Sequence, residues 1–388
     1  MSTIIDQVTL HTPFKTIPDG TLISSDEGNI VYAGPRENAP KVEGQHFSLP
    51  GKIVIPGLID IHVHGGNGVN FGEEDLADNL EKYSQWVASG GVTGFLLSIA
   101  GPDADSLSQL IAAYAEILDR GLGAAQALGL HLEGPFLNKE KKGAFNPDWL
   151  RLPDLEETRR YIELGRGWVK QVTLAPELPK ADEVAKLFNQ AGVVVALGHS
   201  NTDYETASQA LKGHFTHITH TYNAQSGFSH RVPGVFGAVL TSDVITGELI
   251  ADGVHVHPGA IKLLWRCFGK DRIILITDAI AGAGLPDGEY HLIGQHVTVK
   301  DGRATLDDGT IAGSTATLNR CVCNIHRFTD ASLMEAVQMA SYNPARLIGA
   351  EKDMGSLDAG KLANLAVIDE DVNVMLTMVK GKIVYNAS

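Results

Sequence analysis

The stretch LIDIHVHG (58–65) is a short apolar run that ends in a His-x-His pair, and it opens a series of eight such runs. Segments of helical period separate several of them, for example ADSLSQLIAAYAEILDRG (104–121). Near-continuous apolar strands that alternate with helices are typical of a parallel sheet covered on both faces. A count of eight favours a closed (β/α)8 barrel, or TIM barrel, over an open doubly wound sheet. The other seven runs are TGFLLSIA (93–100), ALGLHLEGP (127–135), KQVTLAPE (170–177), VVVALGHS (193–200), FTHITHTYN (215–223), TGELIADGVH (246–255) and RIILITDA (272–279).

The two ends of the chain have a different pattern. The first 55 residues are short β-like runs broken by turn residues, and the tail GSLDAGKLANLAVIDEDVNVMLTMVKGKIVYN returns to short strands. We predict that residues 1–55 and 350–388 form a small β-sandwich built from both termini. Residues 56–349 then form the catalytic barrel, and the chain is α/β in class. A length of 388 residues suits one large domain with a smaller companion.

Charge and cysteine content exclude several classes of partner. The chain has 31 Lys and Arg against 46 Asp and Glu, a formal net charge of −15, which argues against nucleic acid or an anionic membrane. A small anionic ligand is still compatible, because a few local cations can hold a phosphate. The three cysteines Cys267, Cys321 and Cys323 are too few for a disulfide framework and indicate a reducing compartment. Since we find no signal peptide and no run of ~18 apolar residues, we expect a cytoplasmic protein.

Histidines and carboxylates stand at the ends of five of the apolar runs. In a barrel enzyme the active site lies at the carboxyl ends of the strands, so these side chains should meet at one mouth. Such side chains are the usual ligands of a catalytic zinc or iron that keeps a position open for water. The His-x-His pair can converge on one ion because alternate residues of a strand share a face. The residues are His62, His64, Glu133, His199, His220 and Asp278.

Each of these residues taken alone also fits a structural role. A strand-end histidine can be a hydrogen-bonded core residue, Glu133 can be an ion-pair partner, and Asp278 can cap the next helix. Five strands that carry such groups at the same end favour the metal site. His217 lies three residues from His220, on the opposite strand face by alternation, and we expect it to be structural. We assign no metal role to eight further histidines: His11, His46, His131, His214, His230, His291, His296 and His326.

The motifs around these residues resemble a known family over essentially the whole chain. They are PGLIDIHVHG (56–65), LHLEGPFLN (130–138), KKGAFNP (141–147), LAPE (174–177), GHS (198–200), HTYNA (220–224), RVPG (231–234), ADGVH (251–255), TDA (277–279), AGS (312–314) and NPAR (343–346). In this combination they resemble the N-acetylglucosamine-6-phosphate deacetylases of the amidohydrolase superfamily. The resemblance implies hydrolysis of the acetamide of a sugar phosphate at a divalent metal centre, in amino-sugar catabolism.

The resemblance also implies roles for individual residues. Glu133, His199 and His220 would bind the principal metal, and Asp278 would be the catalytic acid and base. An arginine at the place of Arg231 reaches the phosphate across a dimer interface in this family, which implies a homodimer. The implied substrate contacts are Ala144, Asn223, Ala224, Arg231, His255, Ala312, Gly313 and Ser314.

Two features depart from the simplest family pattern. One-metal members lack the His-x-His pair, whereas this chain has His62 and His64, as two-metal members do. Many members have a carbonyl-polarising histidine after the KKG turn, where this chain has Phe145. We therefore expect one or two divalent ions per chain. Zinc is the first choice of metal, and iron, cobalt, manganese and nickel are alternatives. Our hypothesis is that a second ion on His62 and His64, bridged through Glu133, takes over part of the missing polarisation.

Three alternative functions share features with this sequence. A deacetylase for N-acetylgalactosamine 6-phosphate would share nearly every motif, and the sequence does not separate the two sugars. A cyclic-amide amidohydrolase usually bridges two metals with a modified lysine at the end of strand four, but here that strand ends in LAPE and Lys170 lies at its other end. A scaffold without activity would be expected to lose metal ligands, and this chain keeps them.

Overall fold

The computed structural model describes residues 1–387 and contains the predicted barrel. Eight parallel strands follow one another around it, each hydrogen-bonded to the next in chain order. Each of the eight apolar runs supplies one strand, so the prediction of an α/β barrel is confirmed. The strands are β6 (Leu58–Val63), β9 (Val92–Ile99), β10 (Gln126–Glu133), β11 (Val169–Leu174), β12 (Val194–Leu197), β13 (His217–Ile218), β14 (Thr246–Ile250) and β15 (Ile273–Ile276).

Backbone hydrogen bonds join the first and last strands of the barrel at the mouth. The amide of Asp278 donates to the carbonyl of His62 at 2.9 Å, and the amide of His64 donates to that of Ala279 at 2.9 Å. The segments after β6 and β15 are therefore held side by side. As a result, three candidate metal ligands from opposite ends of the barrel sequence lie within one small region.

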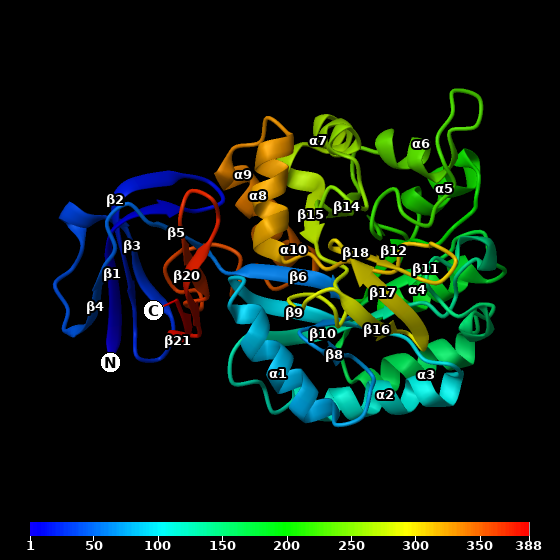
Figure 1. Cartoon of the computed structure of the whole chain (residues 1–388), viewed down its shortest axis with the longest axis horizontal. Helices are drawn as coiled ribbons and strands as arrows, with labels where there is room; N and C mark the ends of the chain where they lie inside the picture. Colours follow the sequence, from blue (N-terminus) through cyan, green and yellow to red (C-terminus); the bar gives the residue numbers. More distant parts are fainter. Residues whose placement is uncertain (388) are drawn as a thin grey trace.

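Helices cover the outside of the barrel (Figure 1). Their apolar residues recur at helical spacing, as in α4, where Ala181, Val184, Ala185 and Phe188 are buried. Asp154 begins α3 by accepting hydrogen bonds from two amides of its first turn. The helices are α1 (Leu76–Ala88), α2 (Ala104–Leu118), α3 (Leu155–Gly165), α4 (Ala181–Gln190), α5 (Tyr204–Lys212), α6 (Gly234–Leu240), α7 (Pro258–Arg272), α8 (Leu318–Phe328), α9 (Leu333–Ala340) and α10 (Tyr342–Leu347). Along residues 1–387, none of the helices combines the length and apolarity that a bilayer crossing needs.

A second, smaller layer is built from both ends of the chain, as predicted, and Figure 1 shows both termini within it. Its strands hydrogen-bond as one mixed sheet in the order β21–β20–β19–β5–β1–β2–β3, with β4 beside β1. The N-terminal and C-terminal parts meet where β5 pairs antiparallel with β19. The domain bounds 1–55, 56–349 and 350–388 stay a prediction. The strands are β1 (Ser2–His11), β2 (Thr16–Ser24), β3 (Ile30–Pro35), β4 (Gly44–Ser48), β5 (Ile53–Pro56), β19 (Leu365–Ile368), β20 (Val374–Val379) and β21 (Lys382–Asn386).

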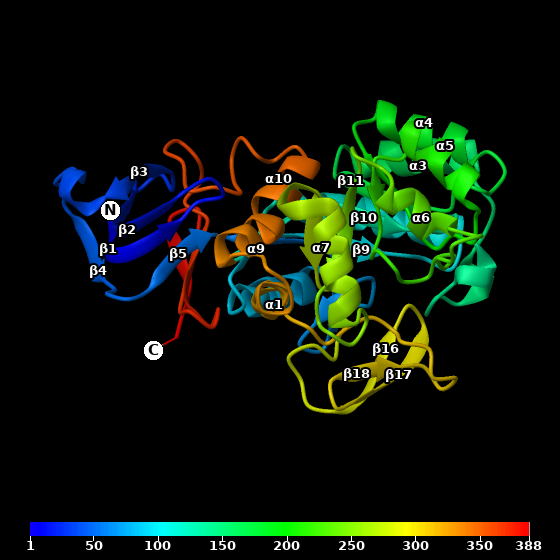
Figure 2. The ribbon, with the colours of Figure 1, turned by 90° about the horizontal axis from the view of Figure 1, so that it is seen from above.

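A three-stranded antiparallel sheet projects from the barrel after β15 (Figure 2). It consists of β16 (Gly288–Leu292), β17 (Gln295–Lys300) and β18 (Arg303–Thr305). The turn between β16 and β17 is Ile293–Gly294, and both residues have a positive φ, +48° and +71°. Leu292 and Ile293 line the cavity at the barrel mouth, so the tip of this hairpin forms part of the site.

Candidate metal centre

Three of the expected ligands meet around one carboxylate oxygen. Oε1 of Glu133, at the end of β10, lies 3.1 Å from Nε2 of His199 and 3.1 Å from Nε2 of His220. The two histidine nitrogens are 3.0 Å apart, and all three side chains are buried. Glu133, His199 and His220 thus form a compact set of nitrogen and oxygen donors suited to a divalent cation.

A second set of donors also lies beside Glu133. Nε2 of His64 is 3.0 Å from Oε2 of Glu133 and 3.4 Å from Oδ1 of Asp278. Nε2 of His62 is 3.5 Å from Oε1 of Glu133 and 3.6 Å from the same Asp278 oxygen. His62, His64 and Asp278 therefore form a second group of possible ligands, and Glu133 lies between the two groups.

The residues present fit a cation at both groups. Nε2 of His62 is buried and has no hydrogen-bond partner among the described residues, although it points toward two carboxylates. Nε2 of His199 and Nε2 of His220 face each other. Among the described residues, the hydrogen-bond acceptor that both atoms contact is Glu133. Burial lowers the pKa of His62, but Glu248, Glu133 and Asp278 outweigh burial and raise that pKa well above its usual value. The electrostatic field of the cluster therefore favours positive charge, either protons or a metal ion that displaces them.

The backbone is strained at three of these residues. His199, His220 and Asp278 have φ values of +47°, +26° and +51°, in the left-handed region that residues with a side chain rarely adopt. Each such residue costs roughly 1–3 kcal/mol and persists only where its surroundings hold it. In this conformation, just beyond the ends of β12, β13 and β15, His199 and His220 reach Glu133 and Asp278 reaches His62 and His64.

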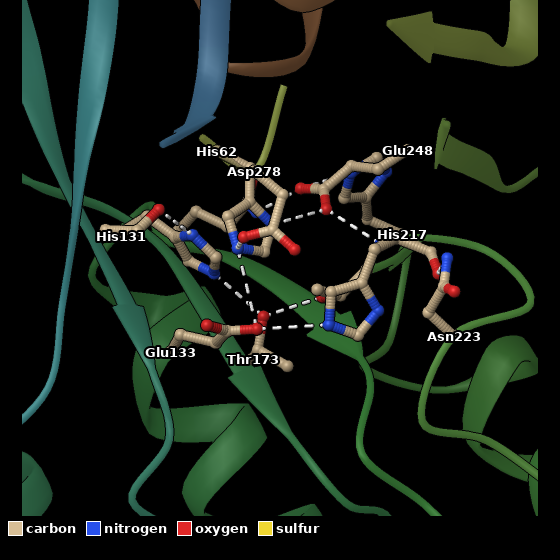
Figure 3. Close-up of polar contacts among 12 residues, drawn as sticks. His62, His131, Glu133, Thr173, His217, Asn223, Glu248 and Asp278 are labelled. Carbon is tan, nitrogen blue, oxygen red and sulfur yellow. Dashed lines mark hydrogen bonds and ion pairs between the residues drawn. The ribbon is translucent and has the colours of Figure 1, made fainter. Parts of the chain in front are cut away.

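Glu248, in the middle of β14, was not identified from the sequence. Its Oε2 accepts from Nδ1 of His62 at 2.8 Å and from the amide of His220 at 2.9 Å, and its Oε1 accepts from Gln171 at 2.6 Å. Figure 3 shows this carboxylate on the other side of His62 from Glu133. Burial raises the pKa of Glu248, but His62 and His217 outweigh burial and hold it well below its usual range. The only signal in the sequence was a charged residue within an apolar run.

Two neighbouring histidines pair with side chains outside the two donor groups. His131 contacts the Ser98 hydroxyl through Nδ1 and the Thr173 hydroxyl through Nε2, each at 2.8 Å. Burial and the adjacent His62 lower its pKa well below the usual value, so His131 is neutral. His217 contacts Thr246 at 2.7 Å and Glu248 at 3.4 Å. The alternative role for Asp278 as a helix cap is wrong, because no helix begins between Asp278 and Leu318.

A cavity of about 380 Å³ opens above the two groups of ligands. Of the residues expected to contact substrate, five line it: Ala144, Asn223, Ala224, His255 and Gly313. Nδ1 of His255 is fixed by Asp252 at 2.8 Å, which leaves its Nε2 for another partner. Glu140 and Lys141 also line this cavity and were not singled out from the sequence, although Lys141 lies in the quoted KKGAFNP motif.

Three expected substrate contacts lie outside the cavity lining. Ala312 is buried in the small core beside the β16–β18 sheet. Ser314 is buried, and its hydroxyl donates to the carbonyl of Thr277 at 2.5 Å, while its amide donates to that of Asp278 at 2.8 Å. Ser314 therefore supports the strained backbone at Asp278. Arg231 is exposed on the loop before α6.

The match with a family model decides the relationship of this chain. The model of the amidohydrolase family matches residues 53–384. The chain belongs to the amidohydrolase family. It is 38% identical over 335 residues to N-acetylglucosamine-6-phosphate deacetylase of Vibrio furnissii, a match that covers 86% of this chain and 84% of that protein.

Two further relatives bear on the substrate. The chain is 36% identical over 332 residues to N-acetylgalactosamine-6-phosphate deacetylase of Escherichia coli O157:H7, covering 86% of this chain and 88% of that protein. Among solved structures, it superposes with a TM-score of 0.91 on a mutant N-acetyl-D-glucosamine-6-phosphate deacetylase of Mycobacterium smegmatis in complex with N-acetyl-D-glucosamine 6-phosphate. That match has 31% identity and covers 100% of this chain and 99% of the other. This amidohydrolase therefore shares its fold and most of its length with deacetylases of amino-sugar phosphates.

Proposed function

We propose that this chain hydrolyses N-acetyl-D-glucosamine 6-phosphate to D-glucosamine 6-phosphate and acetate. The observation that carries the proposal is the position of Glu133 beside the group His62, His64 and Asp278, with a cavity above both donor groups. The near-full-length likeness to deacetylases of this substrate supports the choice of sugar.

Asp278 is the proposed acid and base. Its side chain is 13% exposed, against 0–6% for the two histidines beside it and 3% for Glu133, so it is the member of its group most open to the cavity. A divalent cation, when bound, lowers the pKa of a coordinated water toward ~7 and polarises the amide carbonyl. Asp278 accepts the proton that water loses as its oxygen bonds to the carbonyl carbon. The same carboxyl then delivers that proton to the sugar nitrogen as the carbon–nitrogen bond breaks.

We propose that each chain binds two divalent ions, with zinc as the first choice of metal. One ion would bind to Glu133, His199 and His220, and the other to His62 and His64. Oε1 of Glu133 lies 3.1 Å from His199 and from His220, and Oε2 lies 3.0 Å from His64, so the carboxylate reaches both groups. Phe145 is buried, and its ring packs edge-on against His199 at 5.3 Å, so it offers the substrate carbonyl no hydrogen bond. A second ion held by His62 and His64 would supply part of the carbonyl polarisation that Phe145 cannot.

Arg231 is proposed to bind the phosphate of a substrate held in the partner subunit of a homodimer. It does not line the cavity of its own chain, and its neighbours on the same loop, Phe228 and Val232, are 59% and 63% exposed. Exposed apolar side chains around an arginine are suited to an interface between copies. The planar guanidinium matches phosphate oxygens. The three free cysteines support a reducing compartment, and we propose the cytoplasm.

The deciding experiment is a turnover assay with both N-acetylhexosamine 6-phosphates and elemental analysis of the same sample. We expect the glucosamine derivative to have the higher kcat/KM. A preference for the galactosamine derivative would transfer the proposal to the alternative function, which the Escherichia coli relative supports. A cyclic-amide hydrolase is disfavoured because Lys170 lies at the start of β11, away from the mouth.

A further inference from the structure

A second cavity, of about 490 Å³, adjoins the site described above. His64, Leu292 and Ile293 line both cavities, so the two meet at the second group of metal ligands. The mechanism proposed so far uses only the first cavity. The walls of the second include the apolar Phe71, Leu110 and Trp149 and also the polar Asn70, Ser106 and Gln109.

The junction between the cavities is built from apolar side chains at a cost in backbone strain. Ile293 has a φ of +48°, and a β-branched residue in this region is a genuine outlier. A two-residue hairpin turn with positive φ at both positions ordinarily has Asn or Asp before Gly. Here Ile293 occupies that position and packs with Ala100 against Phe145, Leu137 and Leu150. Strain of this kind is concentrated at ligand-binding sites.

The chemistry of the two cavities matches the two sides of an N-acyl sugar. The first cavity has polar and cationic groups, including Asn223, His255 and Lys141, which suit a sugar phosphate. The residues shared by the two cavities are His64, Leu292 and Ile293. A sugar in the first cavity with its carbonyl at the metal ligands would have its acyl group toward these residues, and the second cavity lies beyond them.

We infer that the second cavity is an acyl chamber, and that the chain hydrolyses hexosamine 6-phosphates whose N-acyl group is longer than acetyl. This inference rests on the proposed function. The chamber takes neutral alkyl chains, because Glu73 and Glu74 are exposed at its border and repel an acyl group that ends in a carboxylate.

The test compares N-acetyl, N-propanoyl and N-butanoyl glucosamine 6-phosphate as substrates of the whole enzyme. In a pocket closed around a methyl group, each added methylene lowers kcat/KM by roughly 10- to 200-fold. We expect kcat/KM for the butanoyl substrate to stay within about tenfold of that for acetyl, less than one closed-pocket methylene costs. An N-succinyl substrate should be hydrolysed more slowly than the butanoyl one.

Variants on α2 separate the chamber from the catalytic groups. Ala113 is half-buried and lines only the second cavity. Ala113→Phe should leave acetyl turnover within about twofold and lower butanoyl turnover by at least about tenfold, the size of one methylene lost from a pocket. Ala113→Ser, which barely changes volume, is the matched control. If Ala113→Phe does not fold, Leu110→Ala enlarges the chamber and should raise the butanoyl-to-acetyl ratio.

The outcomes distinguish the two proposals. Hydrolysis of the acetyl substrate with rejection of the butanoyl one by more than about 100-fold would overturn the acyl chamber and leave the deacetylase intact. Absence of turnover on every N-acyl hexosamine 6-phosphate, in protein loaded with zinc, would overturn the deacetylase itself. An equal loss of turnover on the acetyl and butanoyl substrates in folded Ala113→Phe would also refute the chamber.

Discussion

Oε2 of Glu248 lies 2.8 Å from Nδ1 of His62, and both side chains are fully buried. The same oxygen accepts from the amide of His220, so one carboxylate orients ligands of both donor groups. A carboxylate on the far nitrogen of a metal-binding histidine fixes its tautomer and its direction. Glu248 is therefore a positioning residue for the whole centre.

Glu248→Gln should weaken metal binding without removing any ligand. The amide keeps the size of the side chain but removes the charge that orients His62, and the loss of such a partner costs ~10- to 100-fold in metal affinity. The measurement is titration of zinc into chelator-treated protein. Glu248→Ala should in addition lower the free energy of unfolding by about 3–5 kcal/mol, because it leaves buried charge unpaired. Unchanged zinc affinity in Glu248→Gln would remove the positioning role.

Asp278→Asn should abolish most turnover and leave the first ion in place. Loss of a group that transfers protons costs about 10²- to 10⁴-fold in kcat. The donors Glu133, His199 and His220 do not include Asp278, so at least one ion per chain should remain by elemental analysis. Near-normal turnover in this variant would exclude Asp278 from the mechanism.

The double substitution His62→Asn and His64→Asn should reduce the metal content from two ions per chain to one. It removes both histidines of the second donor group and leaves the first group intact. Elemental analysis of wild type and variant, purified side by side, measures the difference. One ion per chain in active wild-type enzyme would refute the second ion, since both histidines are present there.

Arg231→Ala should raise KM strongly for the phosphorylated sugar and hardly change turnover of unphosphorylated N-acetylglucosamine. Arg231→Lys is the matched control, because lysine keeps the charge but loses the planar fork, and it should be intermediate. Light scattering on the same samples reports the oligomeric state. A monomeric wild-type enzyme, fully active, would rule out the contribution of Arg231 to a partner's site.

The stability of chelator-treated protein should fall as the pH rises above about 6.5. Burial lowers the pKa of His62 and of His220, but the carboxylates around them outweigh burial and raise both pKa values in the folded state. A raised folded pKa stabilises the protein below the unfolded pKa, near 6.5, and this contribution is lost as the pH rises through the folded pKa.

Zinc should reverse this dependence, because bound ions need neutral histidines and bind more tightly as the pH rises. Thermal unfolding of chelator-treated and zinc-loaded protein over a pH series measures both trends. Parallel curves for the two samples would contradict the prediction.

Much of the fold and of the metal centre could be predicted because both depend on local patterns. Eight apolar runs identified the barrel strands, and the candidate ligands stood out because each lies at or just beyond the end of such a run. Glu248 was missed because it lies within its strand, and its partners His62, Gln171 and His217 come from three other strands. Only the closed barrel brings them together.

The face assigned to His217 shows another limit of pattern reasoning. Alternation along a strand placed it opposite His220, away from the site. The strand β13 covers only His217–Ile218, however, and His220 has a φ of +26°, so alternation does not extend that far. His217 lies 3.4 Å from Glu248 and so contacts the network beneath the metal ligands.

The pairing of β5 with β19 has a consequence for synthesis. One edge of β5 lies against β1 early in the chain, but its other edge pairs with a strand that follows residues 57–364. At ~5–20 residues per second, a ribosome needs roughly 15–60 s to deliver that partner. During this interval the nascent chain exposes an apolar strand edge, a template for pairing with other chains. Early engagement of this edge by a chaperone would therefore favour the yield of folded protein.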